Sequence, residues 1–330
     1  MGVYQKGNTF KTILEDISKS RIEKIGMERY IRDYSTEVDS ELDDLLQYNN
    51  LSRVVYPLYK ILSLIPHDSF ELLLNGRPVY SIVMYLAGLS EYDRVSDNEI
   101  NNMFYKAWAF KHISRSDNSA LHLGLEFNTT SRFLEELKAT LRILKKDSNY
   151  GDLFRMLDNK PVIRDRDGEY WLGSDVLFLV DKELDFLKQL QEESGLSVSE
   201  LGIPDSYDML IPSGFDIPHD KESRPIKSMF REDAYEMIKH ICPRIQNEDI
   251  FDLVEHLRLR KTLNEWFVNK LMISGMEEDF LKELIEIKYF PSKLNMVGRY
   301  IISWRLDQYR KKVPDIYYKN IRVKLGDSRT

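Results

Sequence analysis

The spacing of apolar side chains predicts a mainly helical chain. Leucine, isoleucine, valine and aromatic residues recur at steps of three and four, which places them on one face of a helix. Pro78 opens one such run, Ser96 starts a capping sequence before another, and Asp181 and Gly195 bound a third. The segments in which we expect helices with a buried stripe are 10–34, 42–55, 78–86, 96–108, 131–146, 182–194, 250–257, 280–285 and 296–312.

In one segment the helical spacing of apolar residues gives way to a pattern typical of β-strands. Val162 to Leu172 reads VIRDRDGEYWL, in which Asp167-Gly168 is the turn signal of a two-residue β-hairpin and Tyr170-Trp171-Leu172 favours a strand. The sequence therefore predicts a small β-hairpin element in an otherwise helical protein.

A proline-rich segment divides the chain. Residues 197–231 carry prolines at positions 204, 212, 218 and 225 and show little periodicity, which is typical of a semi-rigid linker. We predict a helical N-terminal domain with the hairpin over 1–196, the linker over 197–231, and an all-helical C-terminal domain over 232–330.

Composition narrows the class of protein. Hydrophobic residues make up 42% of the 330 positions, ample for a buried core, and no apolar run approaches the roughly 20 residues needed to cross a bilayer. The first ten residues, MGVYQKGNTF, lack the apolar stretch of a secretion signal, so we expect a cytoplasmic protein. The single cysteine, Cys242, excludes an internal disulfide and a multi-thiolate metal site, and its apolar surroundings predict a buried side chain.

Charge is segregated along the chain. The net charge is -7, yet residues 291–330 hold ten Lys or Arg against three Asp, a local charge of +7 that leaves -14 for the rest. An acidic body with a basic end indicates local contact with phosphate rather than wrapping of nucleic acid. In the predicted helix 296–312 the bases that flank the apolar stripe, and that we expect to face solvent, are Arg299, Arg305, Arg310 and Lys312.

The densest group of cations lies between two predicted helices of the C-terminal domain. His256, Arg258, Arg260 and Lys261 fall within six positions. Such a run is typical of a solvated helix face. It is also the composition of an anion site, because guanidinium groups bind phosphate oxygens in pairs and histidine adds a donor.

The sequence contains no convincing catalytic motif. The histidines are scattered, and neither a Walker loop nor a dinucleotide-binding glycine loop is present. Asp165 and Asp167 form an Asp-x-Asp pair that a metal-dependent nuclease or nucleotidyltransferase would complete with a third acid, but Asp167 is the residue a turn before Gly168 requires. The acids between Asp33 and Asp44 lack the spacing of a calcium loop, so we expect most of them to be structural.

The order of these parts resembles the large subunit of archaeal and eukaryotic DNA primases. From about residue 45 to 290 it runs through paired helices, a Tyr-Trp-Leu strand and a capped helix. Cys242, the His/Arg cluster, an Ile273-to-Met276 step and an acidic amphipathic helix over 277–285 then follow. The resemblance implies a non-catalytic subunit whose partners are the catalytic small subunit, a DNA template, an RNA or DNA primer, and nucleoside triphosphates.

The resemblance also assigns a role to the cationic cluster. In the family a His/Arg group at this place contacts the triphosphate of the starting nucleotide or primer, a role that falls here on His256, Arg258 and Arg260, with Lys261 as an addition. The four bases of helix 296–312 would touch nucleic acid.

Two further expectations concern the hairpin and the cofactor. Tyr170 and Trp171 would be exposed at the small-subunit interface, and core packing is the other interpretation. The family's iron–sulfur cluster needs four cysteines, and only Cys242 has a counterpart here, so no cofactor is expected. Outside this family, the alternative is a helical adaptor of a cytosolic complex that docks through its basic end.

Overall fold

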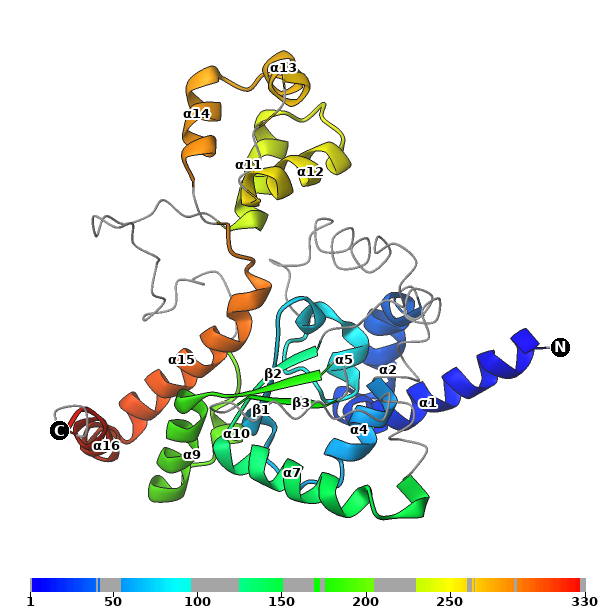
Figure 1. Cartoon of the computed structure of the whole chain (residues 1–330), viewed down its shortest axis with the longest axis vertical. Helices are drawn as coiled ribbons and strands as arrows, with labels where there is room; N and C mark the ends of the chain where they lie inside the picture. Colours follow the sequence, from blue (N-terminus) through cyan, green and yellow to red (C-terminus); the bar gives the residue numbers. More distant parts are fainter. Residues whose placement is uncertain are drawn as a thin grey trace.

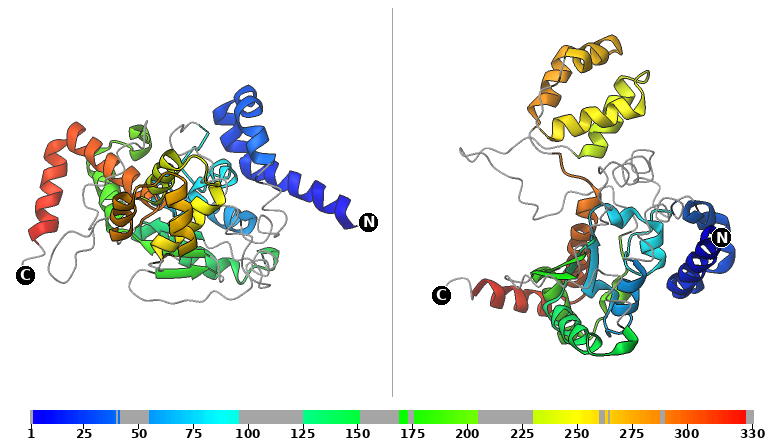
Figure 2. Two further views of the ribbon diagram at one scale, coloured as in Figure 1. Left: turned by 90° about the horizontal axis from the view of Figure 1, so that it is seen from above. Right: turned by 45° about the vertical axis from the view of Figure 1, so that its right-hand side comes forward.

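The protein is mainly helical with one small sheet, as the sequence predicts. The computed structural model describes residues 2–39, 41, 55–95, 125–150, 169–172, 176–204, 230–259, 263, 265–287 and 290–326. Figures 1 and 2 show two parts: a larger body built around the sheet, and a group of helices at one end of the molecule. We call this group, α11 to α14, the helical module.

The helices of the module are α11 (Arg231–Ile241), α12 (Asn247–Arg258), α13 (Glu265–Ile273) and α14 (Glu278–Glu286). Those of the body are α1 (Gly2–Ile25), α2 (Met27–Arg29), η1 (Tyr30–Tyr34), α4 (Tyr56–Leu62), η3 (Ser69–Glu71), η4 (Arg77–Tyr80), α5 (Ile82–Leu86), α7 (Ser131–Leu144), η5 (Ser148–Tyr150), α9 (Lys182–Ser194), α10 (Val198–Leu201), α15 (Leu294–Lys312) and α16 (Pro314–Gly326). Five helices, α7, α9, α12, α14 and α15, fall on predicted segments, whereas α11, α13 and α16 were not predicted. The predicted helix 96–108 and all but the last residue of 42–55 lie outside the described residues. No helix among the described residues is both long enough and apolar enough to span a bilayer.

The predicted first helix is interrupted. α1 ends at Gly26, whose φ of 89° lies in the left-handed region that glycine adopts without a steric penalty. α2 and a π-helical turn, η1, continue the chain after it. Leu14 and Ile17 are buried as the sequence predicts, whereas the break at Gly26 is not predicted.

The sheet comprises β1 (Leu72–Asn75), β2 (Leu125–Thr129), β3 (Glu169–Leu172) and β4 (Val176–Val180), in the order β1-β2-β4-β3. β2 and β4 run parallel in the centre, and β1 and β3 are antiparallel to their neighbours. The strand predicted at 170–172 is confirmed as β3, but its described partner is β4, which was not predicted. The expected turn at Asp167-Gly168 lies outside the described residues.

Each central strand leads directly into a helix. Thr130 follows β2 and caps α7, its hydroxyl accepting from the Phe133 amide at 3.1 Å. Asp181 follows β4 and caps α9, its carboxylate accepting from the Glu183 amide at 2.8 Å. α9 then ends at left-handed Gly195, as predicted. The apolar sides of both helices are buried.

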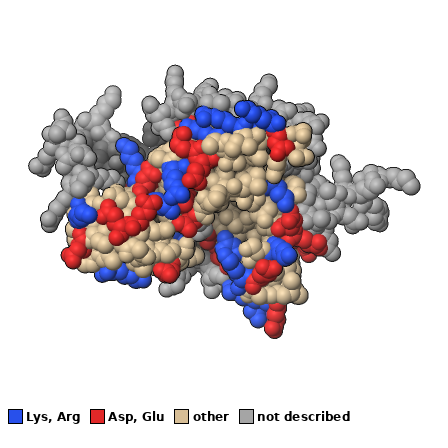
Figure 3. All heavy atoms as spheres, turned by 90° about the horizontal axis from the view of Figure 1, so that it is seen from below, with Lys and Arg blue, Asp and Glu red and all other residues tan. Residues whose placement is uncertain are grey.

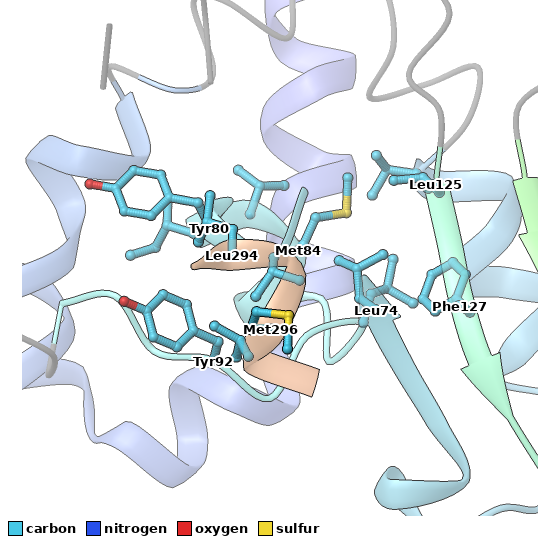
Figure 4. Close-up of a cluster of buried hydrophobic side chains, with 14 of the residues drawn as sticks. Leu74, Tyr80, Met84, Tyr92, Leu125, Phe127, Leu294 and Met296 are labelled. Atoms are coloured by element: carbon cyan, nitrogen blue, oxygen red, sulfur yellow. The ribbon is translucent and has the colours of Figure 1, made fainter. Parts of the chain in front are cut away.

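The last two helices belong to the body, which changes the predicted domain division. α15 packs on β1, η4, α9 and α10, and α16 packs on α9 and α15. Figure 4 shows Leu294 and Met296 of α15 among body residues such as Leu74, Tyr80 and Phe127. The expectation of one helical domain over 232–330 is therefore corrected: the module ends before α15. The sequence does not predict this boundary, because an apolar helical stripe does not reveal which element it packs against.

The predicted linker is shorter at its start. α10 contacts α9 and α15, with Val198 and Leu201 buried, so residues 198–201 are part of the body. Residues 205–229 lie outside the described residues.

A clasp of buried polar groups joins the module to α15. The Arg231 amide donates to the Pro291 carbonyl at 3.0 Å. The Glu232 carboxylate accepts from the Ser292 hydroxyl at 2.7 Å and the Lys293 amide at 3.0 Å. Since Lys293 is the N-cap of α15, Glu232 of α11 supplies the acceptor that the start of this helix needs. Burial raises the pKa of the Glu232 carboxyl.

A second buried carboxylate stabilises the N-terminal part of the body. Glu41 is buried and accepts from the amides of Ile82 and Val83, at 2.9 and 3.4 Å, and from the Ser81 hydroxyl. Arg94 Nη2 lies 3.3 Å from its Oε2. Among the acids between positions 33 and 44, this one therefore has the structural role that the sequence predicts. Glu41 accepts hydrogen bonds from the first amides of α5, rather than stabilising the N-terminus of the helix that the sequence predicts beside it.

Candidate functional site

Two members of the predicted cationic cluster lie in the last turn of α12. The helix buries Ile250, Leu253, Val254 and Leu257, the predicted stripe. His256 and Arg258 occupy the last turn, where cations complement the helix dipole. Both side chains are half-buried. Arg260 and Lys261 lie outside the described residues, so their part in the site stays a prediction.

The guanidinium of Arg258 is oriented by a carboxylate of its own helix. Its Nε donates to Glu255 Oε2 at 3.0 Å, and its Nη2 lies 2.9 Å from the same oxygen. The other oxygen of Glu255 accepts from Arg231 Nη1 at 3.3 Å. One carboxylate thus lies between two guanidinium groups and the trio is net positive. The third nitrogen of Arg258, Nη1, makes no hydrogen bond to the described residues.

His256 is fixed by a local contact. Its Nδ1 lies 2.7 Å from the Asp252 carbonyl oxygen. A carbonyl can only accept, so Nδ1 carries a proton and Nε2 of the neutral ring is an acceptor. The ring packs against Phe267 of α13, with centroids 5.2 Å apart. To donate to an anion through Nε2, the imidazole must therefore take up a second proton.

Cys242 is buried, as the sequence predicts. It ends α11, and its Sγ lies 3.9 Å from the Leu271 carbonyl oxygen. Burial raises the pKa of the thiol, which disfavours the reactive thiolate. Among the described residues no group of three or more His, Cys, Asp or Glu is arranged to hold a metal ion. Asp165 and Asp167 lie outside that part of the chain.

The basic residues of α15 do not share one surface. Arg305 was expected to face solvent and is only 2% exposed, so that expectation is wrong. Its Nε donates to the Gly202 carbonyl at 3.1 Å, and its Nη2 lies 2.8 Å from Glu91 Oε2. The physical reason is that α15 is covered on this side by residues near α10 and after α5. Arg305 is therefore a structural link within the body.

The other three bases are more exposed. Arg299 lies 2.9 Å from Glu183 and 3.5 Å from Asp181, Arg310 is paired with Asp307, and Lys312 is exposed. The face of the body in Figure 3, seen from below, shows Lys and Arg interspersed with Asp and Glu. Such mixing does not make a continuous track for a phosphate backbone.

The structure tests the predicted exposure of Tyr170 but not that of Trp171. Tyr170 is 4% exposed, and its ring lies 6.5 Å from that of Phe178 on the paired strand β4. The expectation that it is exposed at an interface is wrong for this residue, because β3 directs it into the core. The side chain of Trp171 lies outside the description, so its place at an interface stays a prediction.

Some contacts of the site were missed by the sequence reasoning. Glu255 stands three residues before Arg258, a spacing at which helix side chains meet, so this pair could have been found. Arg231 is distant in sequence and gave no signal. Trp266 of α13, whose ring lies 4.9 Å from that of Phe267, was also missed.

Comparison with known proteins adds no family. No family model matches the chain, and no curated protein sequence shows significant similarity to it.

Proposed function

We propose that this chain is the non-catalytic large subunit of a heterodimeric primase, whose helical module binds the triphosphate of the initiating nucleotide. The observation that supports this most is the last turn of α12, which carries both His256 and Arg258, on a module set apart from the body. Glu255 holds the Arg258 guanidinium at the end of α12, and Arg231 keeps that carboxylate neutralised when Arg258 leaves it to bind a phosphate.

The remaining roles follow from the same proposal. The partners are a catalytic small subunit, a DNA template with its primer, and nucleoside triphosphates, in the cytoplasm. Arg260 and Lys261 extend the phosphate site, and Arg299, Arg310 and Lys312 contact nucleic acid. Arg305 has no part in this, since it is buried. No cofactor is proposed.

Equilibrium binding of ATP and GTP tests the site directly. A charge-assisted hydrogen bond contributes about 1.5–3 kcal/mol, so Arg258→Ala should weaken both nucleotides by about ten- to a hundredfold. Phosphate contacts carry no base identity, so the two losses should be equal. Lys282→Ala, which removes an exposed cation from α14 of the same module, is the matched control and should change neither affinity. Equal losses in both variants, or no nucleotide binding by the wild-type protein, would refute the site.

One observation favours the second candidate, a helical adaptor. Trp266, Met272, Ile273 and Ile285 of the module are exposed, which is the kind of surface that docks another protein. An adaptor predicts no change in nucleotide affinity with Arg258→Ala.

A further inference from the structure

The module exposes apolar side chains on two consecutive helices, α13 and α14. Trp266 is 55% exposed and Ile273 87% exposed; they stand seven residues apart on α13 and therefore on one face, about 10 Å apart along the axis. Met272 lies beside Ile273, and Ile285 is exposed near the end of α14. We call these four residues the α13–α14 apolar surface.

The surface is held in a defined shape. On their inner sides α13 and α14 bury Phe267, Leu271, Leu281 and Leu284. Lys270 stands over the Trp266 ring, 4.5 Å from its centroid, and pairs with Asp249 of α12. The exposed indole is thus positioned by contacts within the module, which lowers the entropy lost when a partner covers it.

The chemistry of the surface favours a protein over a nucleic acid. Isoleucine and methionine offer no hydrogen bonds to phosphates or base edges, whereas an exposed tryptophan on one helix face with an exposed isoleucine is typical of a protein interface. From Glu277 to Glu286 there are five acidic residues and one lysine. That lysine, Lys282, is paired with Glu278 and Asp279. The exposed side of α14, which also carries Ile285, therefore repels phosphate and attracts cations.

We propose that the α13–α14 apolar surface docks a basic amphipathic helix of a partner protein. Apolar residues at every third or fourth position of that helix cover Trp266 and Ile273. The separation of these two residues along α13 equals that of residues seven apart on the partner helix. Lysine or arginine on its flanks faces the acidic side of α14. This docking goes beyond the proposed nucleotide site and does not depend on it.

The test uses the full chain and a synthetic amphipathic helix with leucine on one face and lysine on the flanks. Ile273→Asp should weaken binding by about tenfold, since a central interface contact is lost. The substitution also adds a negative charge. Simple attraction between a basic peptide and an acidic protein would therefore tighten binding, which makes the sign of the change decisive. Ile143→Asp, at a 69% exposed isoleucine of α7 in the body, is the matched control and should not weaken binding.

Several outcomes would overturn the proposal. One is that the Ile273→Asp variant binds the basic peptide as tightly as the wild type does, or more tightly. Another is that the wild type binds equally well a peptide in which glutamate replaces each lysine. Direct binding of a single-stranded oligonucleotide to the wild-type chain, weakened by Ile273→Ala, would make the surface a nucleic-acid site. Self-association of the wild-type chain that Ile273→Asp abolishes would make it a contact with a second copy. Nucleotide affinity should be unchanged in Ile273→Asp, so failure here is distinguishable from failure of the proposed function.

Discussion

Glu232 offers a quantitative test of how the module is joined to the body. In Glu232→Ala the Ser292 hydroxyl and the Lys293 amide lose their acceptor. An unsatisfied buried group costs about 1–3 kcal/mol, and part of this is offset because the buried carboxylate is no longer desolvated. We therefore expect a loss of about 2–4 kcal/mol in the free energy of unfolding.

Glu232→Gln separates hydrogen bonding from charge. Burial raises the folded-state pKa of Glu232, so the native environment disfavours the charged form. The contribution of such a group is fully present below its ordinary pKa of 4.5 and is lost as pH rises through the raised pKa. Glutamine keeps an acceptor and adds a donor for the serine oxygen, so this variant should match or exceed the wild type at pH 7 and lack that pH dependence.

The assay is chemical denaturation at several pH values, together with hydrogen exchange of the amides at the start of α15. Asp279→Ala is the matched control, because this carboxylate is exposed on α14 and its removal should change stability by under about 0.5 kcal/mol. A Gln variant as unstable as the Ala variant would show that the charge is required. An Ala variant as stable as the wild type would show that the clasp contributes nothing.

Three further predictions follow from buried or paired groups. Glu41→Ala removes the buried one of the two carboxylates that lie 3.3 Å from Arg94 and leaves Glu37 as its partner. The amide of Ile82 also loses its acceptor, so the variant should be destabilised by about 2–4 kcal/mol in urea; a loss below about 1 kcal/mol would contradict this. Hydrogen bonds, of which that from Asn320 is the strongest influence, lower the pKa of Glu193 to about 2. Its support of the α9–α16 contact should therefore be present above pH 4.5 and lost as pH falls toward 2. The measurement is the protection of the α16 amides relative to their intrinsic exchange at the same pH: protection should fall on acidification, and constant protection would refute the prediction. Cys242 should react with a thiol reagent only after unfolding, and Cys242→Ser should cost about 1–3 kcal/mol without abolishing folding; rapid native-state labelling would contradict its burial.

Local signals account for the parts of the fold that the sequence predicts. The Asp181 cap, the Gly195 end and the stripes of α7, α9 and α12 each depend on residues within a few positions of one another. Helix geometry turns such spacings into faces without help from the rest of the chain.

The missed elements depend on contacts distant in sequence. β1, β2 and β4 are runs of four or five residues, too short to distinguish a strand from a piece of helix by period alone. Tyr170 is buried because β4 lies beside β3, and Arg305 because Glu91 and the end of α10 reach it. The local sequence around Tyr170 and Arg305 does not predict which residues they contact in space.

The candidate site shows the same division. His256 and Arg258 stand in one turn of a predicted helix, and Glu255 is within the reach of that turn, so this half of the site is local. Arg231 reaches Glu255 from another helix, and Phe267 reaches His256 from a third. The sequence identifies the cations and the carboxylate of their own turn; only the fold shows that Arg231 and Phe267 reach them.

Primer initiation by a purified complex of this chain with the catalytic subunit that it is proposed to bind tests the central claim most directly, with Arg258→Lys as the variant. Lysine keeps the charge but loses the planar fork, so bidentate phosphate recognition predicts slower initiation, equally for ATP and GTP. Elongation of a supplied primer and assembly of the complex should be unchanged, which serves as the internal control. Wild-type initiation by Arg258→Lys, or primer synthesis by this chain alone, would contradict the account.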